Sequence, residues 1–112
     1  LPNFHPVMED YHSKMTKVAT NVVRLLAQGF GSEESYFDAD FKEPMATLRL
    51  LHYMQKESNP EKGIFACGAH SDFGTCTLLL TDDNPGLQIL YKGEWIDVPP
   101  KPNAFVMNLG GE

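Results

Sequence analysis

The chain changes character at Gly68-Ala69-His70-Ser71-Asp72-Phe73-Gly74-Thr75, which leads directly into the run Cys76-Thr77-Leu78-Leu79-Leu80-Thr81. A short apolar run of this length, bounded by polar residues, favours a buried strand. On an extended backbone, side chains two positions apart point to the same face, so His70 and Asp72 can reach one common point. A His nitrogen and a carboxylate oxygen are two of the three ligands in the two-His, one-carboxylate site of non-haem iron(II). This spacing makes His70 and Asp72 candidate metal ligands.

Length and composition are those of one globular domain or less. The chain has 112 residues, of which 42% are apolar, and a net charge of -6. Since no basic cluster is present, nucleic acid and anionic membrane surfaces are not expected as partners. The two cysteines, Cys67 and Cys76, are too few for a secreted disulfide framework. We expect two small buried thiols in a reducing cytoplasm, without a disulfide between them.

The N-terminal part, residues 1–44, is predicted to be helical. Residues 6–29 place apolar side chains at steps of three and four, which is the pattern of one helix face. Ser32, followed by two glutamates, has the pattern of a second helix start, and Pro44 ends that segment. The apolar stripe of the first helix consists of Met8, Tyr11, Met15, Val18, Val22, Leu25 and Leu26.

Two other groups of side chains could in principle bind a cation. His5 and His12 lie at the start of the first predicted helix. We expect them in surface or capping roles, with no carboxylate or His at ligand spacing on the same helix face. Asp38, Asp40 and Glu43 form an acidic group, for which a solvated face is expected because no EF-hand pattern surrounds it.

The remaining residues, 45–112, are predicted to be mainly β. Lys92-Gly93 has the pattern of a tight hairpin turn, and residues 55–63 that of a loop. Several short strands joined by turns are typical of a jelly roll or sandwich, and a complete jelly roll has about eight strands. With about six, the chain looks truncated at its C-terminus. The predicted strands cover residues 46–53, 64–70, 75–81, 87–91, 94–98 and 104–109.

A lone His-x-Asp is a weak motif, because short patterns often arise by chance. Four further blocks accompany it in order, and one of them is Asn108-Leu109-Gly110. Together the five blocks resemble the 2-oxoglutarate- and iron(II)-dependent oxygenases of the isopenicillin-N-synthase-like group. The blocks lie at residues 48–53, 68–75, 85–89, 93–100 and 108–110, so the resemblance covers residues 45 to 112 and, more weakly, the helix before them.

The resemblance implies an α+β, mainly β, fold: a partial double-stranded β-helix, or jelly roll, with N-terminal helices. His70 and Asp72 match the first two iron ligands of the family, and Tyr53 matches a tyrosine that helps to hold the distal carboxylate of 2-oxoglutarate. Trp95 and Ile89 are assigned to the core, together with Leu87. The implied reaction takes iron(II), 2-oxoglutarate and dioxygen. It oxidises a small organic substrate while 2-oxoglutarate is decarboxylated to succinate.

The sequence also departs from the family. The second iron-binding His and the Arg-x-Ser that anchors 2-oxoglutarate lie beyond Glu112 in the family, so we expect this chain to be a fragment. Gly111 stands where the family usually has Asp, and Met54 where it often has Pro. One alternative is a catalytically inactive remnant that acts as a binding or structural protein. Another is a cupin-like zinc- or sugar-binding sheet. The main substrate, the outcome of the reaction and the oligomeric state stay open.

Overall fold

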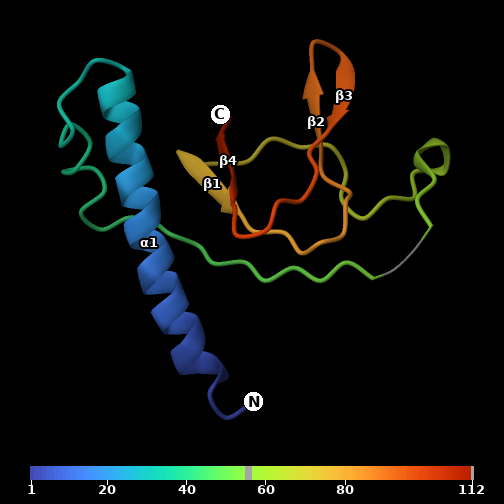
Figure 1. Cartoon of the computed structure of the whole chain (residues 1–112), viewed down its shortest axis with the longest axis horizontal. Helices are drawn as coiled ribbons and strands as arrows, with labels where there is room; N and C mark the ends of the chain where they lie inside the picture. The colour runs from blue at the N-terminus through green and yellow to red at the C-terminus, as the bar shows by residue number, and fades with distance from the viewer. Residues whose placement is uncertain (55–56, 112) are drawn as a thin grey trace. The chain divides into compact units, whose positions relative to one another are not determined.

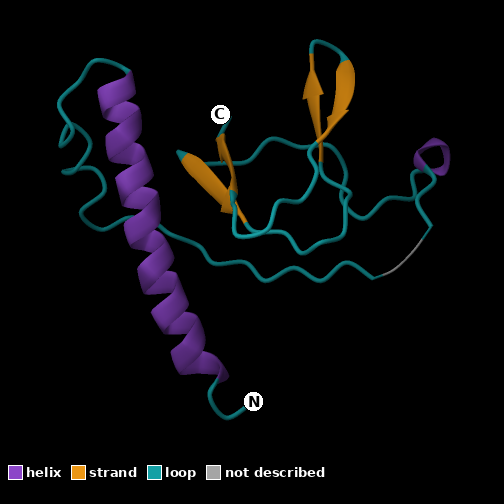
Figure 2. Cartoon of the chain, in the orientation of Figure 1, coloured by secondary structure: helices purple, strands orange, loops and turns teal. Residues whose placement is uncertain are grey.

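The computed structural model describes residues 1–54 and 57–111. It contains helices and antiparallel strands, so the α+β class is confirmed (Figures 1 and 2). The chain forms two compact units, Leu1–Gly68 and Ala69–Glu112. The expected domain boundary between residues 44 and 45 stays a prediction. Within the described residues, none of the helices is long and apolar enough to cross a membrane.

Helix α1 spans Phe4–Gly29 and confirms the predicted N-terminal helix, beginning two residues earlier than expected (Figure 1). The helix ends where Gly31 adopts a φ of 79°, a left-handed conformation that glycine tolerates without strain. Among the described residues, the buried apolar side chains are Val23 and Ala27, which are 4% and 0% exposed. Both lie on α1, so the core of the first unit is centred on this helix.

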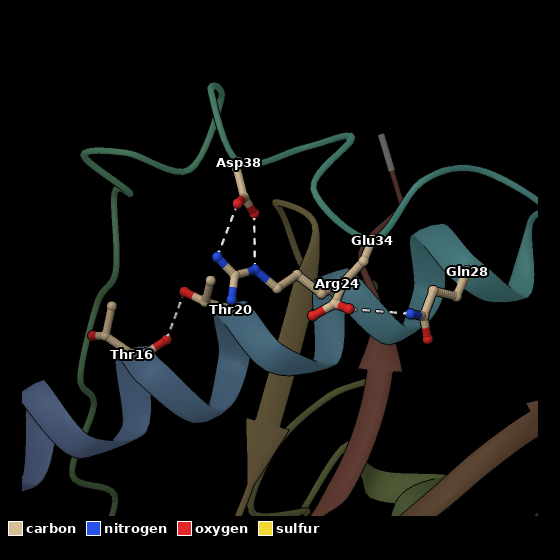
Figure 3. Close-up of polar contacts among 6 residues, drawn as sticks. All are labelled: Thr16, Thr20, Arg24, Gln28, Glu34 and Asp38. Atoms are coloured by element: carbon tan, nitrogen blue, oxygen red, sulfur yellow. Dashed lines mark hydrogen bonds and ion pairs between the residues drawn. The ribbon is translucent and has the colours of Figure 1, made fainter.

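The second predicted helix is wrong, because the residues after α1 form a series of separate turns. The amide of Asp38 donates to the carbonyl of Ser35, and that of Asp40 to Phe37, at 3.0 and 3.1 Å. Such a short segment does not gain enough from helical hydrogen bonds to offset the cost of nucleation. A contact to α1 holds it instead: Arg24 donates two hydrogen bonds to the Asp38 carboxylate, at 2.9 and 2.8 Å (Figure 3).

The second unit contains two separate antiparallel pairs of strands. Strand β1, Cys76–Leu79, pairs with β4, Val106–Leu109, and Thr77 lies opposite Asn108 in the register. These two strands confirm the predicted strands at residues 75–81 and 104–109. Their pairing joins two segments that are far apart in the sequence.

Strands β2, Gln88–Tyr91, and β3, Glu94–Asp97, form the predicted hairpin (Figure 2). Lys92 and Gly93 join them, with φ angles of 51° and 88°. Positive φ at both central residues is the signature of a type I′ turn, whose twist matches that of the flanking strands. The hairpin prediction is therefore confirmed down to its two turn residues.

Two predicted strands, residues 46–53 and 64–70, are wrong in the described structure. Residues 46–53 join no ladder, and Ile64 makes only an isolated bridge to Asn59. An alternating pattern needs a partner strand before its backbone groups can form a ladder. The predicted loop over residues 55–63 contains the short 3₁₀ helix η1, Pro60–Lys62, and its residues 55–56 lie outside the described part.

The assignment of Trp95 and Ile89 to the core is also wrong here, since they are 53% and 48% exposed. They lie in the two-stranded ribbon formed by β2 and β3. A two-stranded ribbon buries side chains only when another layer packs on its face. The described residues form a helix and two small antiparallel sheets. The jelly-roll arrangement itself therefore continues to rest on the sequence resemblance.

Candidate metal centre

The two candidate ligands lie side by side, just before β1. His70 Nε2 is 3.4 Å from Asp72 Oδ1. The two side chains are 57% and 31% exposed, so both face an accessible surface of the second unit. The segment is not part of a strand in this structure. It nevertheless brings the imidazole and the carboxylate together, as their spacing of two residues leads one to expect.

The Asp72 carboxylate is held by two neutral donors from the paired strands. Asn108 Nδ2 donates a hydrogen bond of 2.9 Å to Asp72 Oδ2, and the Thr77 hydroxyl is a second neutral donor group beside the same carboxylate. Thr77 and Asn108 are opposite each other in the β1–β4 register. These two side chains lower the pKa of Asp72, and the nearby His70 lowers it further. Hydrogen bonds to the charged form explain the direction of this pKa shift.

Backbone contacts fasten the Asp72 loop to the end of β4. The amide of Gly111 donates to the carbonyl of Asp72 at 2.9 Å, and the amide of Gly110 to that of Thr75 at 3.2 Å. A side chain at Gly110 would overlap the carbonyl group of Gly74. Only glycine therefore allows the two backbone segments to approach so closely. Gly74 itself has a φ of 84°, which also favours glycine.

The donor set fits a first-row divalent metal. Two donors that occupy adjacent corners of an octahedron, each about 2.1 Å from a metal, lie about 3 Å apart. The 3.4 Å between His70 Nε2 and Asp72 Oδ1 is close to that separation. Across the described part of the chain, no group of three or more His, Cys, Asp or Glu side chains could hold a metal ion. His70 and Asp72 therefore stay candidates for two of the three ligands in a two-His, one-carboxylate site.

Tyr53, the candidate contact for 2-oxoglutarate, belongs to the first unit and is 52% exposed. Partial desolvation raises the pKa of its hydroxyl, and a hydrogen bond with the neighbouring Cys67 thiol raises it further.

The expectation of two buried cysteines is wrong for Cys67, which is exposed, whereas Cys76 is half-buried. Desolvation raises the pKa of the Cys76 thiol. The structure records no disulfide between Cys67 and Cys76.

The other candidate cation ligands have local partners instead. His12 Nε2 lies 2.9 Å from the carbonyl oxygen of Ala46. The expectation that His5 has no carboxylate on its helix face is wrong, because Glu9, one turn further on, lies 3.3 Å from it. The exposed pair is a weak surface contact. Within the acidic group, Asp38 is not simply solvated, since it forms the ion pair with α1 described above.

The sequence pattern assigns no role to the two residues beside Asp72. Asn108 belongs to one of the five family-like blocks, and Thr77 has the pattern of an ordinary strand residue. One signal was present, since asparagine is depleted in strands and Asn108 lies within a predicted one. Nothing local could have placed it beside Asp72, because that contact spans 36 residues.

Comparison with known proteins agrees with this chemistry. The model of the 2OG-Fe(II) oxygenase superfamily matches residues 46–112. The chain is 44% identical over 106 residues to the 2-oxoglutarate-Fe(II) type oxidoreductase hxnY of Emericella nidulans, covering 92% of this chain and 30% of that protein.

Two further relatives carry different substrates in their names. Clavatol oxidase claD of Penicillium crustosum is 37% identical, over 96% of this chain and 33% of the relative. The 2'-deoxymugineic-acid 2'-dioxygenase of Hordeum vulgare is 38% identical, over 93% of this chain and 30% of the relative. The chain thus spans about a third of the length of these curated relatives. On the family match and the arrangement of His70 and Asp72, this chain belongs to the 2OG-Fe(II) oxygenase superfamily.

Proposed function

We propose that this chain is part of a non-haem iron(II)- and 2-oxoglutarate-dependent oxygenase that oxidises a small organic molecule. The observation that carries the proposal is the pairing of His70 with Asp72, 3.4 Å apart, beside β1. Family membership supports the same assignment, since the family's description names both iron(II) and 2-oxoglutarate. We further propose that the whole protein folds as a jelly roll around this pair.

In this proposal, His70 Nε2 and Asp72 Oδ1 are two of the protein's iron ligands. Iron(II) and 2-oxoglutarate, when bound, supply the activation of dioxygen, with release of succinate and carbon dioxide. The protein provides ligand placement, a binding pocket and orientation of the substrate. Tyr53 contributes a hydroxyl to the distal carboxylate of 2-oxoglutarate. The whole protein must supply a second His ligand and an arginine for that carboxylate, and relatives about three times as long have room for both.

The main substrate is a small organic molecule in this proposal. The relatives' names include clavatol and 2'-deoxymugineic acid, which are different compounds. Hydroxylation, desaturation and ring closure are all compatible with the ligand pair. The two thiols, which form no disulfide, support a reducing compartment such as the cytoplasm.

The test is succinate release by the whole protein with iron(II) and 2-oxoglutarate. His70→Ala and Asp72→Ala should each abolish this activity, because each removes a direct metal ligand, while circular dichroism shows a retained fold. His5→Ala and Asp83→Ala are matched controls from exposed positions and should keep wild-type activity. Near wild-type succinate release by either ligand variant would contradict the metal assignment.

A second measurement is the intact mass of the protein isolated from its source. The proposal expects a mass well above the 12.5 kDa of this chain. A mass near 12.5 kDa would contradict it, because the second His and the arginine would then be missing. The alternative of an inactive binding protein would become the working hypothesis.

A further inference from the structure

We propose that Asn108 and Thr77 are positioning residues that together fix the orientation of the Asp72 carboxylate for metal binding. This inference rests on the proposed function, because it assumes that Asp72 is a ligand. It adds to that function a cross-strand pair that sets which carboxylate oxygen faces the metal.

The geometry divides the two oxygens of Asp72 between different neighbours. Oδ2 accepts the 2.9 Å hydrogen bond from Asn108 Nδ2, whereas Oδ1 faces His70 Nε2 at 3.4 Å. Thr77 lies directly opposite Asn108 in the β1–β4 register, and its hydroxyl is a donor group beside the same carboxylate. An aspartate carboxylate otherwise rotates readily about its last torsion angle. Holding Oδ2 therefore keeps Oδ1 on the side of the imidazole.

The orientation of the Asn108 amide follows from its neighbours. Its Nδ2 atom lies 2.9 Å from Asp72 Oδ2 and 3.4 Å from the carbonyl oxygen of Leu109. Both neighbours are acceptors, so an amide flipped by 180° would place an oxygen against two oxygens. Asn108 is therefore a donor to Asp72, which is the role that the proposal requires.

The β1–β4 pairing places both donors. Thr77 of β1 and Asn108 of β4 are directly opposite in the antiparallel register, so their Cα atoms are close neighbours across the sheet. Directly opposite residues point to the same face of a sheet. Groups that orient a metal ligand through hydrogen bonds commonly change metal affinity by about tenfold to a hundredfold when they are removed.

Neither donor carries a charge, and this matters for a metal ligand. An amide and a hydroxyl orient a carboxylate while leaving its full negative charge available to a cation. A lysine or arginine in either place would compete with the metal for that charge. The chemistry of the pair thus suits a carboxylate that must bind a divalent cation.

The test measures Co(II) binding to the whole protein by its visible absorption, without turnover. Asn108→Ala should weaken Co(II) affinity by about tenfold to a hundredfold. Thr77→Val, which replaces the hydroxyl with a methyl group, should weaken Co(II) affinity severalfold, whereas Thr77→Ser, which keeps the hydroxyl, should bind Co(II) like the wild type. Asn84→Ala and Thr81→Val are controls outside the site and should bind Co(II) like the wild type. Asn84 bonds Asp82 in a separate turn.

The outcomes separate this inference from the proposed function. If His70→Ala and Asp72→Ala abolish Co(II) binding but Asn108→Ala and Thr77→Val bind normally, the positioning role is wrong and the proposed function stands. If His70→Ala and Asp72→Ala also bind Co(II) normally, the proposed function itself is wrong. If Asn108→Ala fails to fold, the test rests on Thr77→Val and Thr77→Ser. Equal Co(II) affinities of these two variants would overturn the inference.

Discussion

Asp38 and Asp72 each have hydrogen-bond donors beside the carboxylate, but the donors differ in charge. In the first unit, Asp38 accepts two hydrogen bonds from the guanidinium of Arg24 (Figure 3). In the second unit, Asp72 accepts a hydrogen bond from Asn108 and has the Thr77 hydroxyl beside it, and both of these side chains are neutral. The pKa of each carboxyl lies below its usual value as a result. The same direction of pKa shift thus has two different causes.

The difference shows what each carboxylate is free to do. A bidentate guanidinium neutralises the charge of Asp38 and uses both of its oxygens, so this contact has a structural role. The neutral donors orient Asp72 without cancelling its charge, which leaves the carboxylate able to bind a cation. A low pKa is therefore not by itself a sign of a functional aspartate, and the charge of the donors separates the two cases.

The supporting backbone differs as well. The segment that carries Asp38 is a run of turns, held to α1 by side-chain contacts such as Arg24 to Asp38 and Gln28 to Glu34 (Figure 3). The loop that carries Asp72 is fastened through backbone hydrogen bonds to the end of β4. These backbone hydrogen bonds restrict the Asp72 loop, and a metal ligand must be held within a narrow range of geometries.

The largest effect on stability is expected for Gly110→Ala, which disturbs the backbone contact between the Asp72 loop and the end of β4. The added methyl group would overlap the Gly74 carbonyl, so the backbone must shift, at a cost of about 3 kcal/mol in the free energy of unfolding. Urea denaturation of the whole protein measures this cost, and Co(II) binding should weaken with it. Gly86→Ala is the matched control, since a side chain there meets open space. Equal stabilities of the two variants would show that the glycine contact is dispensable.

A smaller effect, on 2-oxoglutarate binding, is expected for Tyr53→Phe. This variant extends the comparison of Asp38 and Asp72 to a third polar side chain. Removing one hydrogen bond to a charged cosubstrate should weaken the binding free energy of 2-oxoglutarate by at most about 1.5–3 kcal/mol. Co(II) affinity should not change, because the hydroxyl is not proposed as a metal ligand. Titration calorimetry with 2-oxoglutarate and with Co(II) measures the two affinities separately. A loss of Co(II) binding, or unchanged affinity for 2-oxoglutarate, would remove Tyr53 from the cosubstrate site.

The smallest effect is expected at the Arg24 and Asp38 pair, which is partly exposed. The hydrogen bonds from Arg24 hold the pKa of Asp38 below its usual value in the folded state, so the pair stabilises the fold wherever the pH lies above the pKa of the unfolded carboxyl. The contribution is lost as the pH falls through the folded pKa. Asp38→Asn should therefore speed amide exchange of residues 38–41 about two- to fivefold at pH 6.

The difference between this variant and the wild type should shrink as the pH falls through the folded-state pKa of Asp38, because the carboxyl then becomes protonated. Amide exchange, corrected for the intrinsic rate at each pH, makes this comparison. A difference that persists undiminished at low pH would mean that the carboxylate charge is not what holds the segment. Co(II) affinity should be the same with Asp38→Asn as with the wild type, in contrast to Asp72→Ala.

The sequence by itself determined the features that depend on neighbouring residues. The apolar stripe predicts α1, because helical periodicity is a local property. Lys92-Gly93 predicts the β2–β3 hairpin, because the turn geometry requires positive φ at two adjacent positions. The two-residue spacing of His70 and Asp72 likewise places these two candidate ligands together.

Only the tertiary structure decided the features that join distant segments. The pairing of β1 with β4 brings Asn108 to Asp72, and the fold of the first unit brings Asp38 to Arg24. Residues 46–53 alternate like a strand, yet they form no ladder among the described residues. The physical reason is common to all three. A strand pair or a long-range hydrogen bond needs a partner, and local sequence carries the propensity to pair but not the identity of the partner.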